Sequence, residues 1–258
     1  MTASSLFDLT GETALVTGAS SGLGRRFARV LAEQGARIAA VARRKERLDE
    51  LARDIEAKGG KALAITTDVA DKAGIASAFD KAEAEFGRVS ILINNAGVAR
   101  PSAFLAMEEK AWRETIDINL DAVIFTAQEA ARRMVAKGGG SIVNIASILS
   151  LGVQKGNLAY AVSKAAVAQA TRAMAVELAG KGVRVNAIAP GFFMSEMTRD
   201  YLATPHAKGM LRAIPMGRLG EEGELDGALL LLASRAGSYM SGSIIVVDGG
   251  HVLAIADR

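Results

Sequence analysis

The chain has 258 residues, of which half are hydrophobic, 23% are charged and 27 are glycine, and its formal net charge is +3. This composition indicates a large buried core with many tight turns and excludes a disordered chain. Because cysteine is absent and there are only two histidines, we expect no disulfide and no metal. The scattered charge argues against a nucleic-acid partner. No apolar stretch is long enough to span a bilayer and no secretory signal is visible, so we expect a cytoplasmic protein without a membrane partner.

Apolar runs of strand length alternate with longer segments of helical periodicity along the whole chain. The strand-length runs are Thr13–Thr17, Ile38–Val41, Ala62–Thr66, Ile91–Asn94, Ile142–Ile145, Val183–Ile188 and Ile244–Val247. The helical segments are Leu23–Gln34, Lys45–Lys58, Lys72–Phe86, Glu108–Ala136, Leu158–Ala179 and Glu221–Leu232. Nearly continuous apolar runs are typical of strands buried on both faces of a parallel sheet. The alternation predicts a single α/β domain over residues 1–258, with a doubly wound, seven-stranded, mainly parallel sheet flanked by helices on both faces.

A glycine-rich turn, Thr17-Gly-Ala-Ser-Ser-Gly-Leu-Gly24, follows the first predicted strand and opens the first helix. Gly18 permits a tight turn, Gly22 lets the backbone approach a pyrophosphate, and Gly24 allows close packing of helix on strand. Free N–H groups at the helix start favour phosphates. The strand–turn–helix context favours a Rossmann-type dinucleotide site over plain turn glycines. The contacts are predicted from Gly18, Ser20, Ser21, Gly22, Leu23 and Gly24.

The residues after the second predicted strand indicate which nucleotide binds. A ribose 2′-hydroxyl requires an acidic residue there, whereas a 2′-phosphate requires arginine. The chain reads Val41-Ala-Arg-Arg44 and has no acidic residue at this position. Arg43 is placed to meet a phosphate, so NADP(H) is the preferred cofactor and NAD(H) the alternative. A competing interpretation is that both arginines begin a solvated helix, and Arg44 alone fits that interpretation well.

Three residues in the second half of the chain point to proton chemistry. Tyr160 and Lys164 are four residues apart in a helical segment and so share one helix face. An ammonium group beside a phenol favours the phenolate and lowers the pKa of the phenol, which can then exchange a proton with a substrate oxygen near neutral pH. Ser147 ends the apolar run that precedes this helix. The alternative, an exposed helix pair without a catalytic role, is disfavoured by Ser147 and the glycine turn.

The region from 192 to 216 interrupts the alternation of strands and helices, with two prolines and no strong periodicity. Ligands bind at the carboxyl edge of the sheet in such folds. We therefore interpret this region as a substrate lid, with a plain surface excursion as the alternative. Largely apolar side chains are the candidates for the substrate pocket: Leu149, Gln154, Phe192, Met197 and Tyr201. They favour a small-molecule substrate with a sizeable apolar part.

These motifs and several others occur together in one order. They are Thr17-Gly-x3-Gly-x-Gly24, Asp68-Val69, Asn94-Asn-Ala-Gly97, Asn119, Ser147, Tyr160-x3-Lys164, Pro190-Gly191 and Val247-Asp-Gly-Gly250. With them the chain resembles the short-chain dehydrogenase/reductase family in its single-domain form, from about Leu9 to Gly250. Any one motif is modest evidence, but all of them at the family's spacing make a chance match very unlikely.

The resemblance implies further cofactor contacts. Asp68 and Val69 match positions that hold the adenine, and Asn95, Ala96 and Gly97 match the turn beside the adenine-side ribose. Pro190 and Gly191 match the turn that lines the nicotinamide, to which Phe193 belongs, with Ser195 in place of the threonine that the family often has. Two alternatives without a role in cofactor binding stay open. Asp68 can be a helix N-cap, and Asn94 and Asn95 can serve only to satisfy buried backbone groups.

The resemblance also implies a reaction, the reversible transfer of hydride between a nicotinamide and a carbonyl or secondary alcohol, as in 3-oxoacyl or ketone reductases. Tyr160 acts as the general acid or base, and Ser147 donates a hydrogen bond to the same substrate oxygen. Lys164 lowers the pKa of Tyr160 and holds the nicotinamide ribose. Asn119 supports a water relay behind Lys164, or alternatively caps or kinks a long helix.

The sequence leaves several rival functions open, and the resemblance also predicts how the chains assemble. The rivals are a catalytically silent, nucleotide-binding regulatory protein of the same fold, an NAD-dependent alcohol dehydrogenase, and a family member that performs elimination or epimerisation. His206 and His251 are interpreted as surface or structural residues, and Asp248-Gly-Gly250 as a turn. In the family, Glu108–Ala136 and Leu158–Ala179 pair across one two-fold axis and Glu221–Leu232 with Ile244–Val247 across another, so we expect a homotetramer.

Overall fold

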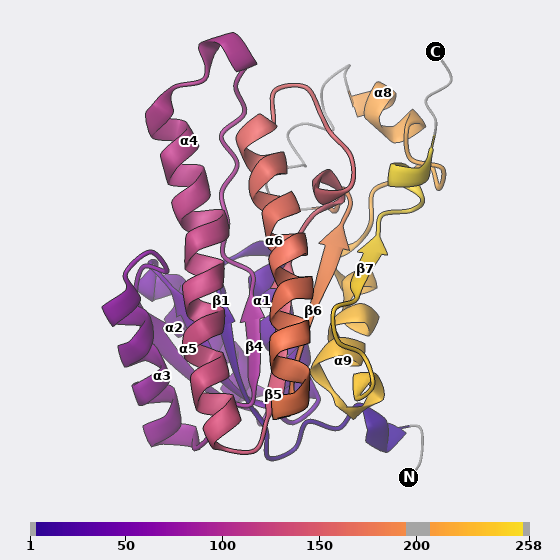
Figure 1. Ribbon diagram of the computed structural model, residues 1–258. Helices are drawn as coiled ribbons and strands as arrows, with labels where there is room; N and C mark the ends of the chain where they lie inside the picture. The colour runs from indigo at the N-terminus through magenta and orange to yellow at the C-terminus, as the bar shows by residue number, and fades with distance from the viewer. Residues whose placement is uncertain (1–3, 195–206, 255–258) are drawn as a thin grey trace.

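The computed structural model describes residues 4–194 and 207–254 of the chain. Its centre is a seven-stranded sheet in the order β3-β2-β1-β4-β5-β6-β7, in which every neighbouring pair is parallel (Figure 1). The strands are β1 (Thr13–Thr17), β2 (Arg37–Ala42), β3 (Lys61–Thr66), β4 (Ile91–Asn94), β5 (Gly140–Ile145), β6 (Val183–Pro190) and β7 (Ile244–Val247). The prediction of a doubly wound α/β sheet is confirmed, and the sheet is wholly parallel.

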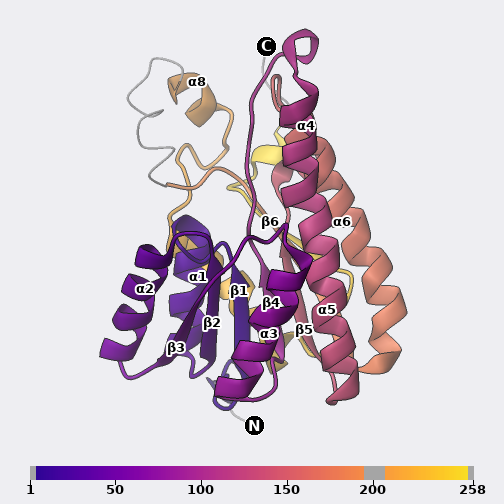
Figure 2. The ribbon, with the colours of Figure 1, turned by 90° about the vertical axis from the view of Figure 1, so that its left-hand side faces the viewer.

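Helices cover both faces of this sheet (Figure 2). The helices are α1 (Gly22–Glu33), α2 (Lys45–Ala57), α3 (Lys72–Phe86), α4 (Glu109–Ile116), α5 (Ala122–Ala136), α6 (Leu158–Leu178), α8 (Ala207–Arg212) and α9 (Asp226–Ala233). Helices α1, α2 and α9 bury side chains against one face, and α3, α5 and α6 against the other. None of the helices within the described ranges is long and apolar enough to cross a membrane.

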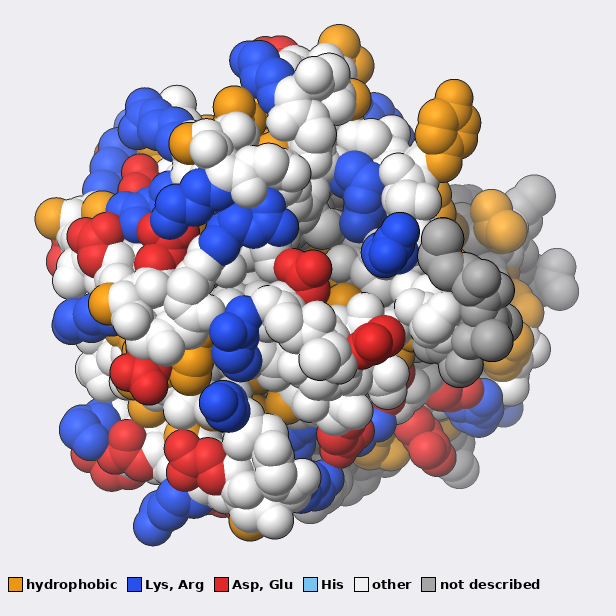
Figure 3. Space-filling model, turned by 90° about the horizontal axis from the view of Figure 1, so that it is seen from below, with side chains coloured by type: hydrophobic (Ala, Val, Ile, Leu, Met, Phe, Trp, Pro, Cys, Tyr) orange, Lys and Arg blue, Asp and Glu red, His pale blue; other side chains and the backbone are white. Residues whose placement is uncertain are grey.

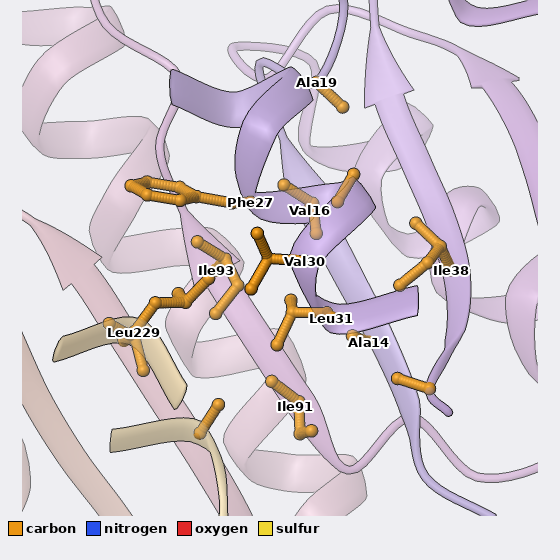
Figure 4. Close-up of a cluster of buried hydrophobic side chains, with 14 of the residues drawn as sticks. Ala14, Val16, Ala19, Phe27, Val30, Leu31, Ile38, Ile91, Ile93 and Leu229 are labelled. Carbon is orange, nitrogen blue, oxygen red and sulfur yellow. The ribbon is translucent and has the colours of Figure 1, made fainter. Parts of the chain in front are cut away.

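The core explains why the strands are apolar without alternation. Along β1, Ala14 and Val16 pack toward α1, whereas Leu15 between them packs toward α3 and α5. Ala14 and Val16 belong to the cluster of buried side chains in Figure 4, in which Phe27 and Leu31 of α1 lie against the strands. Because each strand buries both of its faces, every position along it favours an apolar side chain.

Two predicted helices are interrupted in the structure. The segment predicted as Glu108–Ala136 is α4 and α5 joined by a π-helical turn at Asp117–Asp121. The segment predicted as Glu221–Leu232 begins with a 3-10 turn, Glu222–Leu225, that leads into α9. Single π turns inside α-helices occur often at functional sites, and this one carries Asn119.

Charged side chains of both signs are interspersed over the face of the molecule seen in Figure 3. Ion pairs also join neighbouring helices, such as Arg25 of α1 with Glu50 and Asp54 of α2 at 2.8 Å each. These carboxylates are exposed, so the pairs contribute little to stability.

The strand order places a switch point between β1 and β4, because the chain winds from β1 to β3 in one direction and from β4 to β7 in the other. In such sheets the crevice outside the carboxyl ends of the strands at the switch point is where ligands bind. The glycine turn after β1 and the segment Asn94–Gly97 after β4 both lie at this edge.

Candidate active site

The glycine turn after β1 is packed against the segment that follows β4. A Cβ atom on Gly24 would collide with Asn95 Nδ2 and with the carbonyl oxygen of Gly18. A Cβ on Gly18 would lie 2.8 Å from Asn95 Nδ2, and Gly18 has a φ of 67°, in the left-handed region. Both positions therefore require glycine, so neither residue adds a side chain to the backbone at the start of α1.

Asparagine side chains hold the two segments together. Asn95 Nδ2 donates to the carbonyl of Thr17 at 3.1 Å, and the backbone N–H groups of Asn95 and Ala96 donate to Thr17 Oγ1 at 3.0 and 3.1 Å. Asn94 Nδ2 donates to the Val123 carbonyl at 3.2 Å. Both asparagines thus satisfy backbone carbonyls, Asn95 at the glycine turn itself, and Asn94 Nδ2 also donates to Asn144 Oδ1 at 3.0 Å. A cofactor role for Asn95 stays a prediction.

We expect Gly24→Ala to lower the melting temperature, corresponding to a loss of about 1–3 kcal/mol typical of overpacking, and to weaken dinucleotide binding. The methyl group would push against the Gly18 carbonyl, which is backbone and cannot swing aside. Thermal unfolding and a fluorescence titration with NADPH measure the two effects. Gly180→Ala is the matched control, because nothing lies within 4 Å of a Cβ placed there. Unchanged stability and binding in Gly24→Ala would contradict the packing described above.

Two arginines after β2 lie near the glycine turn but make different contacts. Arg44 donates from Nε and Nη2 to Ser20 Oγ at 3.2 and 2.9 Å, and from Nη2 to Ser21 Oγ at 2.6 Å. Arg43 Nη1 lies 3.6 Å from Asp68 Oδ2. The interpretation of Arg44 as merely the start of a solvated helix is therefore incomplete, because its guanidinium contacts the predicted phosphate-binding turn directly.

The residues after β3 lie beside this pair of arginines. Asp68 Oδ1 accepts from the N–H of Ala70 at 3.0 Å, which forms a local turn. The N-cap of α3 is Asp71, whose side chain accepts from Ala73 N at 3.1 Å, so the N-cap alternative for Asp68 is wrong. Val69 is half-buried and packs against the core cluster beneath α3 and α5.

Ser147, Tyr160 and Lys164 meet at the carboxyl end of β5. Tyr160 and Lys164 lie one turn apart on α6, and a side-chain hydrogen bond joins Tyr160 to Ser147. Lys164 is buried, its Nζ donates to the carbonyl of Ile145 at 2.7 Å, and the same Nζ lies 5.7 Å from the centroid of the Tyr160 ring. Ser147 Oγ also accepts from Leu149 N at 3.1 Å. The structure thus brings together the three residues that the sequence selected for proton chemistry.

Asn119 connects this cluster to the segment after β4. Its Oδ1 accepts from Val98 N and its Nδ2 donates to the Val98 carbonyl, both at 2.8 Å, and Nδ2 also donates to Ser163 Oγ at 3.2 Å. A Cβ on Gly97 would lie 3.3 Å from Asn119 Oδ1 and 3.6 Å from Lys164 Nζ. Asn119 sits inside the π turn and not at a helix end, so it does not cap a helix. The alternative that it lies where a long helix is interrupted agrees with this π turn between α4 and α5.

Burial sets the pKa of both α6 residues. It lowers the pKa of Lys164 from 10.5 to about 8, because the ammonium loses its hydration. It raises the pKa of Tyr160 above 10, and the hydrogen bond from Ser147 opposes that rise. The sequence predicted that Lys164 lowers the pKa of Tyr160, whereas burial of the phenol shifts that pKa upward in this structure. The effect of Lys164 on Tyr160 stays a prediction.

The chain matches known proteins over nearly its whole length. A family model described as enoyl-(acyl carrier protein) reductase matches residues 18–251. The galactitol 2-dehydrogenase (L-tagatose-forming) of Cereibacter sphaeroides is 41% identical over 251 residues, which cover 96% of this chain and 98% of that protein. The 3-oxoacyl-(acyl-carrier-protein) reductase of Thermotoga maritima is 37% identical over 245 residues, 95% of this chain and 99% of that protein.

Solved structures agree with these relatives. A short-chain type dehydrogenase/reductase from Mycobacterium marinum is 42% identical with a TM-score of 0.91, covering 95% of this chain and 97% of that one. The chain belongs to the short-chain dehydrogenase/reductase family. A gluconate 5-dehydrogenase from Burkholderia cenocepacia, in complex with NADP and tartrate, is 38% identical with a TM-score of 0.93 over 98% of this chain and 100% of that one. As a member of this family, the protein is an oxidoreductase.

The turn after β6 differs in part from what the sequence suggested. Gly191 N donates to the Val247 carbonyl at 2.9 Å, and a Cβ on Gly191 would lie 2.6 Å from Asp248 Cβ, so Pro190 and Gly191 are packed against the end of β7. Phe193, predicted as a cofactor contact, has its ring buried in the core against Gly220. Ser195, Met197 and Tyr201, which the sequence assigned to cofactor and substrate, lie outside the described residues.

The described candidates for the substrate pocket are not equally well placed in this short-chain dehydrogenase/reductase. Leu149 is half-buried two residues after Ser147, whereas Gln154 is exposed and accepts from Asn157 Nδ2 at 3.1 Å. Phe192 lies over His251, with ring centroids 5.4 Å apart. A cavity of about 360 Å³ lies beside the carboxyl end of β7, and Phe192 and Met216 are among its lining residues. The sequence placed Met216 only at the end of the predicted lid, residues 192–216, and indicated a surface or structural role for His251. The Val247-Asp-Gly-Gly250 motif directly before His251 was a further signal near this cavity.

A second cavity of about 390 Å³ lies elsewhere, between α3 and α5, where Lys72 Nζ sits 3.3 Å from the centroid of the Phe125 ring. Neither Ser147 nor Tyr160 lines it. Neither residue lines the cavity of about 360 Å³ either, so both cavities lie apart from the residues predicted for proton chemistry.

Proposed function

We propose that the protein is an NADP(H)-preferring oxidoreductase that transfers a hydride between the nicotinamide and a carbonyl or secondary-alcohol substrate. The observation that carries the proposal is the cluster of Ser147, Tyr160 and Lys164 at the same sheet edge as the glycine turn. A hydroxyl donor, a phenol and a buried ammonium beside a dinucleotide site are the groups that proton transfer to a substrate oxygen requires.

The residues present fit a dinucleotide. Gly18 and Gly24 let the turn pack closely against Asn95, and a Cβ on Gly22 would meet nothing within 4 Å, so the start of α1 is open there. The N–H groups at this helix start suit a pyrophosphate. Arg44 adds a cation held on Ser20 and Ser21. We propose that Asp68, Val69, Asn95, Ala96 and Gly97 line the adenosine half, and that Pro190, Gly191 and Lys164 line the nicotinamide half. The bound cofactor supplies the hydride.

The protein's own residues handle the proton and orient the substrate. In the reducing direction Tyr160 Oη donates its proton to the carbonyl oxygen as hydride arrives at the carbon, and in the oxidising direction its phenolate accepts the hydroxyl proton. Ser147 Oγ donates a hydrogen bond to the same oxygen and stabilises its developing charge. Asn119, with both polar atoms on Val98, acts as a positioning residue that keeps Gly97 beside Lys164.

A panel of ketones and secondary alcohols, each assayed with NADPH and with NADH, tests this function. The panel includes polyols, sugar acids and 3-oxoacyl thioesters, because the relatives' names include galactitol, gluconate and 3-oxoacyl substrates. We expect turnover of at least one ketone, with a higher kcat/KM for NADPH than for NADH. Preference for NADH would overturn the cofactor proposal, and absence of turnover with every compound would favour the silent regulatory protein.

The two arginines give a sharper test of the cofactor preference. We expect Arg44→Ala to lower kcat/KM for NADPH by roughly 10- to 100-fold and to leave the value for NADH nearly unchanged, because a charge-assisted hydrogen bond is worth about 1.5–3 kcal/mol. Arg43→Ala is the matched comparison, since Arg43 is exposed and lies against Asp68. A larger effect in Arg43→Ala than in Arg44→Ala would return the phosphate contact to Arg43, as the sequence first indicated.

We also propose a substrate lid over about residues 192–216, a homotetramer and a cytoplasmic location. The first rests on the break in the strand–helix alternation and the second on the family. All three stay predictions.

A further inference from the structure

The last described turn of the chain, the 3-10 turn His251–Leu253, is held in place by the aspartate that precedes it. Asp248 Oδ1 accepts from Gly250 N at 2.8 Å, and Asp248 Oδ2 accepts from Val252 N at 2.7 Å. Gly249 and Gly250 have φ values of 65° and 86°, so the chain reverses there through the left-handed region. One carboxylate and two glycines thus fix the direction in which His251 and Val252 leave β7.

This turn reaches across the loops that follow three neighbouring strands. The His251 ring lies against the ring of Phe192 after β6, with centroids 5.4 Å apart and planes inclined by 38°. Val252 Cγ2 lies 3.7 Å from the place where a Cβ on Gly152, after β5, would stand. A Cβ on Gly250 would lie 3.2 Å from Pro215 Cγ. Figure 1 shows the turn above the carboxyl ends of β6 and β7.

The loops that it contacts carry the proposed chemistry. Gly152 N donates to the Ile148 carbonyl at 2.9 Å, within the turn that starts at Ser147. Phe192 is the second residue after Pro190, the last residue of β6, and Ala146 N donates to the Ile188 carbonyl at 2.8 Å. Ser147 and Phe192 therefore follow two adjacent strands that are hydrogen-bonded to each other, and the His251 ring lies against Phe192.

We infer that His251 is a specificity-determining residue, which together with Phe192 forms a wall limiting the size of the substituent beside the reacting carbonyl carbon. The inference rests on the proposed function. The Asp248 carboxylate holds the backbone N–H groups of Gly250 and Val252, and Val252 lies beside Gly152, so the turn has little freedom to yield to a larger group. His251 Nδ1 is buried without a hydrogen-bond partner among the residues that the structure describes, so packing of the ring is what the structure shows it doing.

The test compares ketones that share one reacting carbonyl and differ only in the bulk of one substituent, from methyl to phenyl. In His251→Ala we expect kcat/KM for the phenyl ketone to rise at least tenfold relative to the methyl ketone, because even one methylene in a tight pocket changes selectivity by 10-fold or more. His251→Phe keeps a ring of similar shape and should retain the wild-type ratio, and His251→Trp should shift the ratio toward the methyl ketone. KM for NADPH should not change in any of them.

Leu253→Ala is the control from the same turn, because Leu253 is 84% exposed; it should leave the ratio at the wild-type value. The inference is overturned if His251→Ala changes both ketones by the same factor, or if the ratio stays within twofold of wild type while the melting temperature is unchanged. If His251→Ala does not fold, the Phe and Trp variants decide, and equal ratios in those two overturn it. Lack of turnover of any ketone by the wild-type protein is a different result, which contradicts the proposed function itself.

Discussion

Tyr160→Phe is expected to reduce kcat by roughly 10²- to 10⁴-fold, the range that a positioned general acid or base contributes. The substitution removes only the hydroxyl group, so the ring keeps its place on α6 beside Lys164. Ser147 loses the group to which it is hydrogen-bonded, but no charge is left unpaired. We therefore expect the fall to appear in kcat, with the dissociation constant for NADPH and the melting temperature close to those of the wild type.

The measurement combines steady-state kinetics with a substrate from the panel, an NADPH fluorescence titration and thermal unfolding. Tyr239→Phe is the matched control, because Tyr239 is fully exposed and removal of its hydroxyl should change nothing. If Tyr160→Phe turned over substrate within threefold of wild type, the acid–base role would be lost, although the family membership would stand. Retained NADPH binding without turnover in both wild type and variant would instead support the regulatory alternative.

Lys164→Met is expected to have the second largest effect on catalysis. A cation near a phenol favours the phenolate by about one to three pKa units, so its removal should slow alcohol oxidation at neutral pH by roughly 10- to 1,000-fold. The reducing direction should be less sensitive, because there Tyr160 starts in its protonated form. Comparison of kcat in the two directions at one pH measures this difference, and equal losses in both would indicate that Lys164 acts mainly by holding the cofactor.

The same variant tests the pKa of Lys164 through stability. The pKa is about 8 in the folded protein and 10.5 for an ordinary lysine, so between these values the unfolded chain binds more protons than the folded one. The free energy of unfolding of the wild type therefore rises with pH across this window, and the penalty for the buried ammonium, about 3 kcal/mol at 1.36 kcal/mol per unit, is fully present below pH 8. Lys164→Met lacks this penalty at every pH.

We accordingly expect the stability of Lys164→Met relative to wild type to be greatest below pH 8 and to decline as the pH rises toward 10.5. Urea unfolding at pH 7 and pH 10 measures the change, and performing both in the Tyr160→Phe background removes the titration of the neighbouring phenol. A difference that grows with pH would mean that the ammonium is stabilised by its surroundings, which would contradict the lowered pKa.

Much of the site could be predicted because its signals are local in sequence. The residues of the glycine turn are consecutive, and Tyr160 and Lys164 are four residues apart on one helix, so spacing alone placed each group on a known face. Ser147 was found by its position at the end of an apolar strand. These three elements converge because the carboxyl ends of parallel strands lie along one edge, which follows from the strand–helix alternation.

Other features could not be predicted, because they depend on the direction and surroundings of single side chains. Arg43 and Arg44 are neighbours, yet only Arg44 contacts Ser20 and Ser21. Phe192 and Phe193 are also neighbours, but Phe193 is buried in the core while Phe192 meets His251. In each pair the residue types are the same, so no pattern in the sequence distinguishes them.

The sequence by itself determined the α/β class, the buried parallel sheet, the dinucleotide turn and the pairing of a phenol with an ammonium, because each depends on residues that are close along the chain. Only the tertiary structure decided the upward shift of the Tyr160 pKa, the contact of Arg44 with the glycine turn and the position of His251 over Phe192. Those depend on desolvation and on packing between strands that are distant in sequence. Burial and distance are properties of the assembled fold, so they can be determined only when β5, β6 and β7 lie side by side.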